Sequence, residues 1–180
     1  MVISGKDENH LEYWWNCGSR KLESGDPISI DYGAMYNGYC SDIARPFVIG
    51  KASDKQKDVV KVLVEAQEAA AVTAKSGVLC SELTNAASKV MKKAWGIEDL
   101  GLGMGHVVGL EVHEWPFIGY HHIKDDEAYR DTRLEENIVI SMEPMMYFPD
   151  VGDFQIEDQF MITKKGAVKL NNISHKIFEV

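Results

Sequence analysis

The chain has 180 residues, of which 45% are hydrophobic and 26% charged, and its formal net charge is -9. This composition is typical of a globular protein rather than a disordered or fibrous one, and the length suits a single domain over residues 1–180. The excess of acidic residues argues against binding to nucleic acid or to an anionic membrane surface, because both require clustered Lys and Arg.

The three cysteines, Cys17, Cys40 and Cys80, are an odd number without a short pairing motif. They favour a reducing compartment over a disulfide framework. No apolar run approaches membrane-spanning length, and the first residues lack the charged-then-apolar pattern of a signal peptide. We therefore expect a soluble, cytoplasmic protein.

The first 24 residues are predicted to be irregular, and the turn signal Gly25-Asp26-Pro27 follows them. Residues 27–34 and 36–49 have the composition of strands and are separated by a short turn region. They are predicted to pair as a β-hairpin.

Two helices are expected next. Ser53 and Gln56 have the spacing of a capping box, and the apolar residues behind them recur at helical spacing until Gly77 ends the run. A second helix is predicted from Ser81 to about Trp95, again closed by a glycine.

Four glycines lie between residues 101 and 109, around His106. This segment is too rich in glycine for a helix and predicts a close approach of the backbone to another part of the chain. Residues 137–148 and 154–163 look like a second antiparallel pair, and residues 164–166 form the next turn. The order of hairpin, two helices and further strands predicts an α+β fold with a largely antiparallel sheet.

Four acids lie inside the predicted strands, where aspartate and glutamate are unfavourable: Asp31, Asp42, Glu143 and Glu157. Any one of them alone is more simply a solvated acid on the outer face of a strand. Each is flanked by apolar residues, however, and a buried carboxylate must be paired, neutralised or bound to metal. Together with His106, the four acids form a donor set that suits two divalent ions such as Mn²⁺, Co²⁺, Fe²⁺ or Zn²⁺.

Four segments then resemble a known family, the pita-bread metallopeptidases, which include methionine aminopeptidases, Xaa-Pro aminopeptidases and prolidases, with creatinase as a non-metal relative. The segments run from Asp31 to Asp42, from Gly105 to Glu114, from Ser141 to Pro144 and from Ile156 to Asp158. The resemblance extends from about Ser4 to the C-terminus, and it is nearer to the Xaa-Pro and prolidase branch than to the methionine branch.

The resemblance implies the pita-bread fold, a mostly antiparallel curved sheet covered by helices, and a two-metal hydrolase. It implies that Asp31, Asp42, His106, Glu143 and Glu157 hold the metals. A water activated between the two ions would attack the scissile bond, and Glu143 would accept its proton. His113 matches a histidine that contacts the substrate or the reacting oxygen.

The resemblance also suggests residues for the substrate pocket. His10 has roughly the place of a family histidine that lines the pocket. His121, His122, Arg130 and Arg133 are candidates for gripping a substrate carboxylate or carbonyl, although a solvated loop explains each of them equally well. His175 is interpreted as a surface residue.

The chain departs from the family pattern in three respects. Helices and a strand normally precede the matched segment in the family, and this sequence starts too late to contain them. We expect a truncated or split form, an excised piece, or a form that completes its sheet through a partner subunit. Missing strands would leave an open sheet edge, which favours a homodimer or other self-association. Glu136-Asn137 stands in place of the usual Pro-Gly. Met142 precedes Glu143 in place of a small polar or branched residue.

Three functions stay open at this stage. The first is a metallopeptidase acting on Xaa-Pro dipeptides or on N-terminal Xaa-Pro bonds. The second is a metalloenzyme of the same fold acting on a non-peptide substrate, such as an amide hydrolase or a lyase. The third is a non-catalytic binding module with an incomplete pocket.

Overall fold

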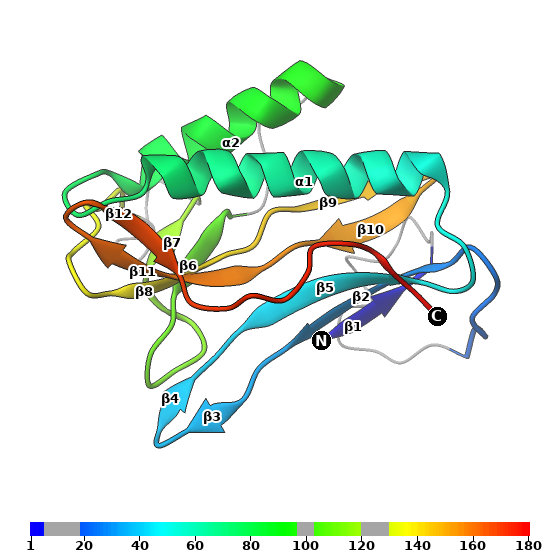
Figure 1. Cartoon of the computed structure of the whole chain (residues 1–180), viewed down its shortest axis with the longest axis horizontal. Coiled ribbons are helices and arrows are strands. Elements are labelled where there is room, and N and C mark those ends of the chain that lie inside the picture. The colour runs from blue at the N-terminus through cyan, green and yellow to red at the C-terminus, as the bar shows by residue number, and fades with distance from the viewer. Residues whose placement is uncertain (6–18, 97–102, 120–129) are drawn as a thin grey trace.

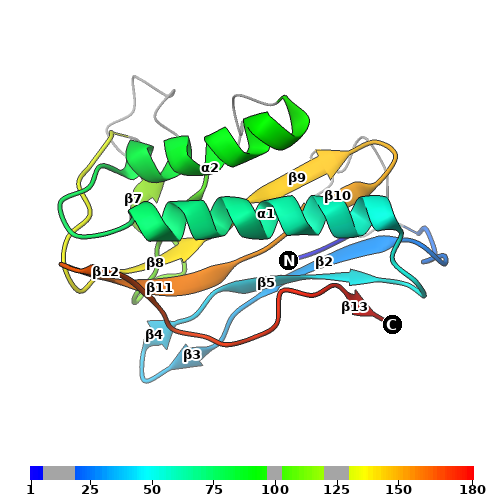
Figure 2. The ribbon, with the colours of Figure 1, turned by 45° about the horizontal axis from the view of Figure 1, so that its top comes forward.

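The computed structural model describes residues 1–5, 19–96, 103–119 and 130–180. Two helices, α1 (Asp54–Thr73) and α2 (Cys80–Trp95), lie side by side over strands that are paired almost entirely in antiparallel fashion (Figures 1 and 2). The prediction of an α+β fold with helices covering a mostly antiparallel sheet is confirmed. Among the described residues, neither helix is long and apolar enough to cross a membrane.

The described strands form two larger sheets and two short ribbons. The first sheet has the order β1 (Val2–Ser4), β2 (Pro27–Tyr32), β5 (Ile43–Val48), β13 (Phe178–Glu179). The second has the order β12 (Gly166–Lys169), β11 (Asp158–Thr163), β8 (Val139–Met142), β6 (Gly105–Val107), β7 (Glu114–Ile118). The ribbons pair β3 (Met35–Tyr36) with β4 (Tyr39–Cys40) and β9 (Met145–Phe148) with β10 (Gly152–Gln155).

Local sequence features set the start of α1 and the end of α2. Ser53 and Gln56 form the predicted capping box, in which each side chain accepts a hydrogen bond from the other residue's backbone N–H. Helix α1 ends at Thr73, before the predicted stop at Gly77, which lies in the following turn with a φ of 90°. Helix α2 is closed by Gly96 in the left-handed conformation, as predicted.

The predicted first hairpin is confirmed as the antiparallel pair β2 and β5. Its second arm is broken, because β3 and β4 form a separate ribbon at the tip, and Asp42 lies just before β5 rather than inside a strand. The prediction that residues 1–24 are irregular is wrong at Val2–Ser4, which form β1 and pair with β2. A three-residue edge strand is too short to leave a periodic signal.

The second predicted pair is also divided. Residues 137–148 and 154–163 contain the ladders β8–β11 and β9–β10, which belong to different sheets. The ladders part where Glu143-Pro144 faces Ile156-Glu157, because proline cannot donate to a continuous ladder. Asn137, at the departure from the family's Pro-Gly, has a φ of 70°, which asparagine tolerates in a turn.

The alternation of side chains in β6 and β8 decides on which face of the sheet the polar residues lie. Val107, Ile140 and Met142 are buried in the hydrophobic core that also contains the inner faces of both helices. Successive side chains of a strand point to opposite faces, so His106 and its cross-strand partner Ser141 face away from the helices. The site therefore forms on the face of the sheet that the helices leave free.

Candidate functional site

Asp31 and Asp42 are brought together by the register of the β2–β5 hairpin. Asp31 pairs with Ala44, and Asp42 precedes Ala44 by two residues, so both acids project from the same face. One carboxylate oxygen of each acid lies within 4.8 Å of a carboxylate oxygen of Glu157. The hairpin thus delivers two acids to one point.

Glu143 and Glu157 arrive at the point where the ladders β8–β11 and β9–β10 part. The backbone N–H of Glu143 donates to the carbonyl of Met104 over 2.9 Å, and that of Glu157 donates to Ala44 over 3.1 Å. The second bond ties the break between the ladders to β5, which directly follows Asp42 and pairs with β2, the strand of Asp31. The Ser141 hydroxyl donates to Glu157 Oε1 over 2.5 Å.

Gly105 allows His106 to join this group. Its φ is 146°, and a Cβ at this position would lie 1.8 Å from the carbonyl oxygen of Ser141. Only glycine lets β6 approach β8 so closely, which confirms the predicted tight approach of the backbone. The neighbouring side chain, that of His106, is then held between the acids of both strand pairs.

The His106 imidazole presents an unprotonated nitrogen to the acids. Its Nδ1 lies 3.0 Å from the carbonyl oxygen of Val107, which can only accept, so Nδ1 carries the proton. Its Nε2 lies 3.6 Å from Asp42 Oδ2, 3.6 Å from Glu143 Oε1 and 3.9 Å from Glu157 Oε1. Burial lowers the pKa of His106 to about 4, so the ring is neutral near pH 7.

The donor atoms form three overlapping groups, two of which have Glu157 in common. His106, Glu143 and Glu157 offer one set of atoms within 4.8 Å of one another, and Asp31, Asp42 and Glu157 offer another. His106 Nε2 and Glu157 Oε2 are buried and have no hydrogen-bond partner among the described residues. Buried polar atoms without a partner are costly, and two such acceptors beside four carboxylates fit divalent cations.

The carboxyl groups repel one another in the absence of cations. Burial, followed by the charge of Asp31, raises the pKa of Asp42 to about 7. Burial, followed by the charges of Asp31 and Asp42, raises the pKa of Glu143 to about 8. Burial also raises the pKa of Glu157 well above its usual value, and the charge of Glu143 adds to the effect.

We expect metal-stripped protein to become less stable as the pH rises from about 5 to about 8. The folded state retains protons on Asp42, Glu143 and Glu157 that the unfolded chain releases near pH 4. The stability that the folded state gains from binding these protons is lost as the pH rises through the raised folded pKa values. His106 acts in the opposite direction, because its lowered pKa disfavours the folded state below about pH 6.5. One imidazole does not offset three carboxyl groups.

Thermal unfolding of chelator-treated protein across this range measures the effect. Added Mn²⁺ should raise the melting temperature most at the alkaline end, because the cations bind the ionised carboxylates. A melting temperature of the stripped protein that rises with pH, or that Mn²⁺ leaves unchanged at pH 8, would contradict the interpretation of the cluster as a cation site.

His113 lies at the mouth of the cluster. It is exposed, its ring centroid is 4.3 Å from that of His106, and one of its nitrogens falls within 4.8 Å of ligand atoms of Asp42 and His106. Both histidines line a cavity of about 630 Å³, together with Asp31, Asp42 and Glu143. Its wall is completed by apolar side chains that include Met35, Val112, Phe117 and Met145.

The structure does not bring the other predicted pocket residues together. His10, His121 and His122 lie outside the described residues. Arg130 is exposed and does not line the described cavity. Arg133 donates to the carbonyl oxygen of Gly77, in the connection between the helices, over 2.7 Å.

The interpretation of His175 as a surface residue is wrong. The side chain of His175 is 24% exposed, and its Nε2 lies 2.5 Å from Oδ2 of Asp158, which is fully buried next to Glu157. Lys169 and Asn171 also donate to Asp158, over 2.8 Å and 2.7 Å. The C-terminal segment is therefore tied to the start of β11, directly after the site residue Glu157.

Arg45 completes this buried network, which the sequence reasoning missed. Arg45 is 1% exposed, and its guanidinium forms an ion pair with Asp158 and donates to the carbonyl oxygen of Glu157 over 2.6 Å. Burial alone would raise the pKa of Asp158, but hydrogen bonds from His175, Lys169 and Arg45 hold it well below its usual range. An arginine between apolar strand residues, Ala44 and Pro46, was the signal available in the sequence.

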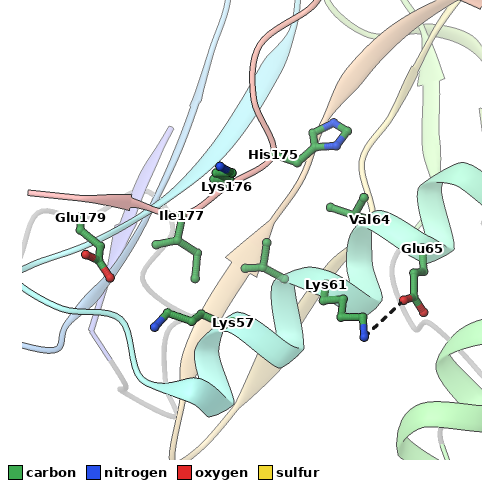
Figure 3. Close-up of a pocket in the computed structure, with 9 residues that line it drawn as sticks. Lys57, Lys61, Val64, Glu65, His175, Lys176, Ile177 and Glu179 are labelled. Atoms are coloured by element: carbon green, nitrogen blue, oxygen red, sulfur yellow. Dashed lines mark ion pairs between the residues drawn. The ribbon is translucent and has the colours of Figure 1, made fainter.

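A second cavity of about 630 Å³ lies between α1 and the C-terminal segment (Figure 3). Val60, Val64 and Ile177 form its apolar lining. Of the charged side chains that line it, Lys61 and Glu65 form the ion pair drawn in Figure 3, at 3.9 Å. The acidic cluster is the stronger candidate for a site, because its buried acceptors have no partner among the residues that the structure describes.

Comparisons with known proteins agree with this geometry. The model of metallopeptidase family M24 matches residues 1–164. An Xaa-Pro dipeptidase of Pyrococcus furiosus is 38% identical over 159 residues, which are 88% of this chain and 43% of that protein. The chain thus spans less than half the length of this curated relative.

Two solved structures are similar over nearly the whole chain. The X-Pro aminopeptidase from Thermotoga maritima MSB8 has a TM-score of 0.84 and 35% identity, covering 100% of this chain and 48% of that one. The prolidase from Pyrococcus furiosus has a TM-score of 0.79 and 34% identity, covering 97% and 49%. The resemblance to the pita-bread metallopeptidases is confirmed, and the chain belongs to metallopeptidase family M24.

Proposed function

We propose that this chain carries a two-metal site for hydrolysis of a peptide bond that precedes proline. The observation that carries the proposal is the convergence of four carboxylates and His106, in which His106 Nε2 and Glu157 Oε2 are buried and have no hydrogen-bond partner within the described part of the chain. Membership of a metallopeptidase family and similarity to an Xaa-Pro dipeptidase and an X-Pro aminopeptidase support the reaction and the substrate class.

The residues would divide the two ions between them. His106 and Glu143 would hold one ion, Asp31 would hold the other, and Asp42 and Glu157 would bridge both. The donor set of oxygens and one imidazole suits Mn²⁺, Co²⁺, Fe²⁺ or Zn²⁺. Cations bound at such a site lower the pKa of a bound water and polarise a carbonyl oxygen.

Glu143 is the residue that would move the proton. Its carboxylate lines the cavity, and Oε1 lies 3.6 Å from His106 Nε2. Positive charge in the cluster would counteract the repulsion from Asp31 and Asp42 that raises its pKa, and would leave the carboxylate free to accept a proton from water. Glu143 would then pass this proton to the leaving nitrogen, which in an Xaa-Pro bond has no hydrogen of its own.

Elemental analysis and a substrate panel test the proposal together. Protein stripped with chelator and reloaded with Mn²⁺, Co²⁺ or Zn²⁺ is assayed on Xaa-Pro dipeptides, N-terminal Xaa-Pro tripeptides, matched Xaa-Ala peptides and small non-peptide amides. We expect two ions per chain and cleavage of the Xaa-Pro substrates ahead of the matched Xaa-Ala peptides.

Other outcomes would assign a different function. Two ions with turnover confined to the non-peptide amides would replace the peptidase by an amide hydrolase of the same fold. Failure to take up any of the three ions would overturn the metal site and leave a binding module.

We expect His113→Ala to keep both ions but to lower the rate by about a hundredfold, because an exposed imidazole beside His106 is placed to donate to the developing oxyanion. Metal content and kcat of the loaded protein measure the two effects separately. Val112→Ala, on the same segment and in the same cavity wall, is the matched control and should retain most of the rate. A His113→Ala rate equal to that of the control would remove His113 from the mechanism.

A further inference from the structure

Gln155 is a buried polar residue of the site that the sequence pattern did not identify. It is the last residue of β10, is 1% exposed and lines the same cavity as Glu143. Its cross-strand partner is Met145, and Glu143 precedes Met145 by two residues, so both polar side chains project from one face of the β9–β10 ribbon.

The Gln155 carboxamide contacts one of the two oxygens of Glu143. Its Nε2 donates to Glu143 Oε2 over 3.1 Å, and a carboxylate admits only the N–H end of the amide. The other oxygen, Oε1, is the atom that faces His106 Nε2 at 3.6 Å. The hydrogen bond therefore decides which oxygen is directed toward the centre of the cluster.

The backbone around this contact is also held. The N–H of Ile156 donates to the carbonyl of Pro144 over 3.2 Å, which keeps the residues after Gln155 and Glu143 paired where the ladder ends. The donor is a neutral carboxamide, so it holds Glu143 Oε2 without adding a positive charge that would compete with metal ions for the same carboxylate.

We propose that Gln155 is a positioning residue that clamps Glu143 Oε2 and so presents Oε1 to the metal nearest His106. This inference rests on the proposed function. Residues that orient a metal-ligating carboxylate change metal affinity without contacting the ion. Gln155 thus acts through Glu143 rather than on the substrate.

The test compares Gln155→Met, which keeps the size of the side chain but removes the donor, with Gln155→Glu, which places a like charge against Glu143. The matched control is Gln56→Met, which removes another buried carboxamide. Gln56 lies in the first turn of α1, and its side chain donates to the carbonyl oxygen of Gly25. Calorimetric titration of the stripped proteins with Mn²⁺ gives stoichiometry and affinity, thermal unfolding gives stability, and kinetics on an Xaa-Pro dipeptide give kcat and KM.

We expect Gln155→Met to weaken one of the two Mn²⁺ binding steps by about 10–100-fold and to lower kcat with little change in KM. Gln155→Glu should weaken that step further. Gln56→Met should lower the melting temperature and leave Mn²⁺ affinity unchanged. Unaltered Mn²⁺ affinity and kcat in folded Gln155→Met would overturn the inference alone, whereas a wild-type protein that binds no Mn²⁺ would overturn the proposed function with it.

Discussion

Glu157→Gln is expected to abolish binding of at least one ion and to lower turnover by at least about a thousandfold, on the order of 4 kcal/mol of transition-state stabilisation. Glu157 is fully buried and belongs to two of the overlapping donor groups, so its loss affects the two ions together. Asp42→Asn should have a similar effect, because Asp42 is also buried and contributes to the cluster. Metal analysis and kcat/KM on an Xaa-Pro dipeptide measure the losses.

The same substitution should have the opposite effect on the stability of stripped protein. Glu157→Gln removes a buried carboxyl group, and both its burial and the charge of Glu143 disfavour its ionised form. The stripped variant should therefore melt at a higher temperature than stripped wild type at about pH 8. Glu111→Gln makes the same chemical change at an exposed position and serves as the control. Full metal content in Glu157→Gln would remove Glu157 from the ligand set.

Arg45→Met is expected to cost about 3–5 kcal/mol of unfolding free energy. The substitution leaves the buried Asp158 without its guanidinium partner and removes donors from the carbonyl oxygens of Ala44 and Glu157. Urea unfolding, monitored by circular dichroism, gives the free energy. Because one of these carbonyls belongs to Glu157, Mn²⁺ affinity should fall as well.

Lys51→Met provides the comparison for Arg45→Met, because Lys51 pairs with Glu179 at the surface and its side chain is 89% exposed. An exposed pair contributes only about 0–1 kcal/mol. The double variant Arg45→Met with Asp158→Leu should recover part of the loss by removing the unpaired charge. Equal losses for Arg45→Met and Lys51→Met would show that burial does not strengthen the Arg45 network.

The elements that the sequence predicted well are those with local causes. The start of α1 follows from a reciprocal side-chain to backbone contact between Ser53 and Gln56, and the end of α2 follows from the left-handed conformation of Gly96. The strands were predicted as longer than they are, because ladder breaks depend on which distant segments pair. The parallel pairing of β13 with β5 joins segments more than a hundred residues apart and leaves no local pattern.

The residues of the candidate site also fall into two groups, those that the sequence identified and those that only the folded structure brings together. The four acids were identifiable because each is flanked by apolar residues in a segment predicted to be a strand, and the resemblance placed His106 and His113 with them. Arg45, Gln155 and Asp158 were missed because their contacts are made across strand pairs that only the folded chain creates. Asp158 was visible within the matched motif, but its buried position beside Glu157 required the register of β8 and β11.

The hydrogen bonds that the backbone N–H groups of Glu143 and Glu157 donate to the carbonyls of Met104 and Ala44 have a consequence for dynamics. Both N–H groups donate to carbonyl oxygens in segments far away in the sequence. Exchange of these amide hydrogens with deuterium therefore requires the paired segments to separate, and local fraying of one turn is not enough. Although both residues lie where the ladders are interrupted, their amides should exchange as slowly as those of the protein interior. If these carboxylates bind cations as proposed, they should distinguish ions by ionic radius, because a backbone held in this way cannot shift to fit a larger or smaller ion.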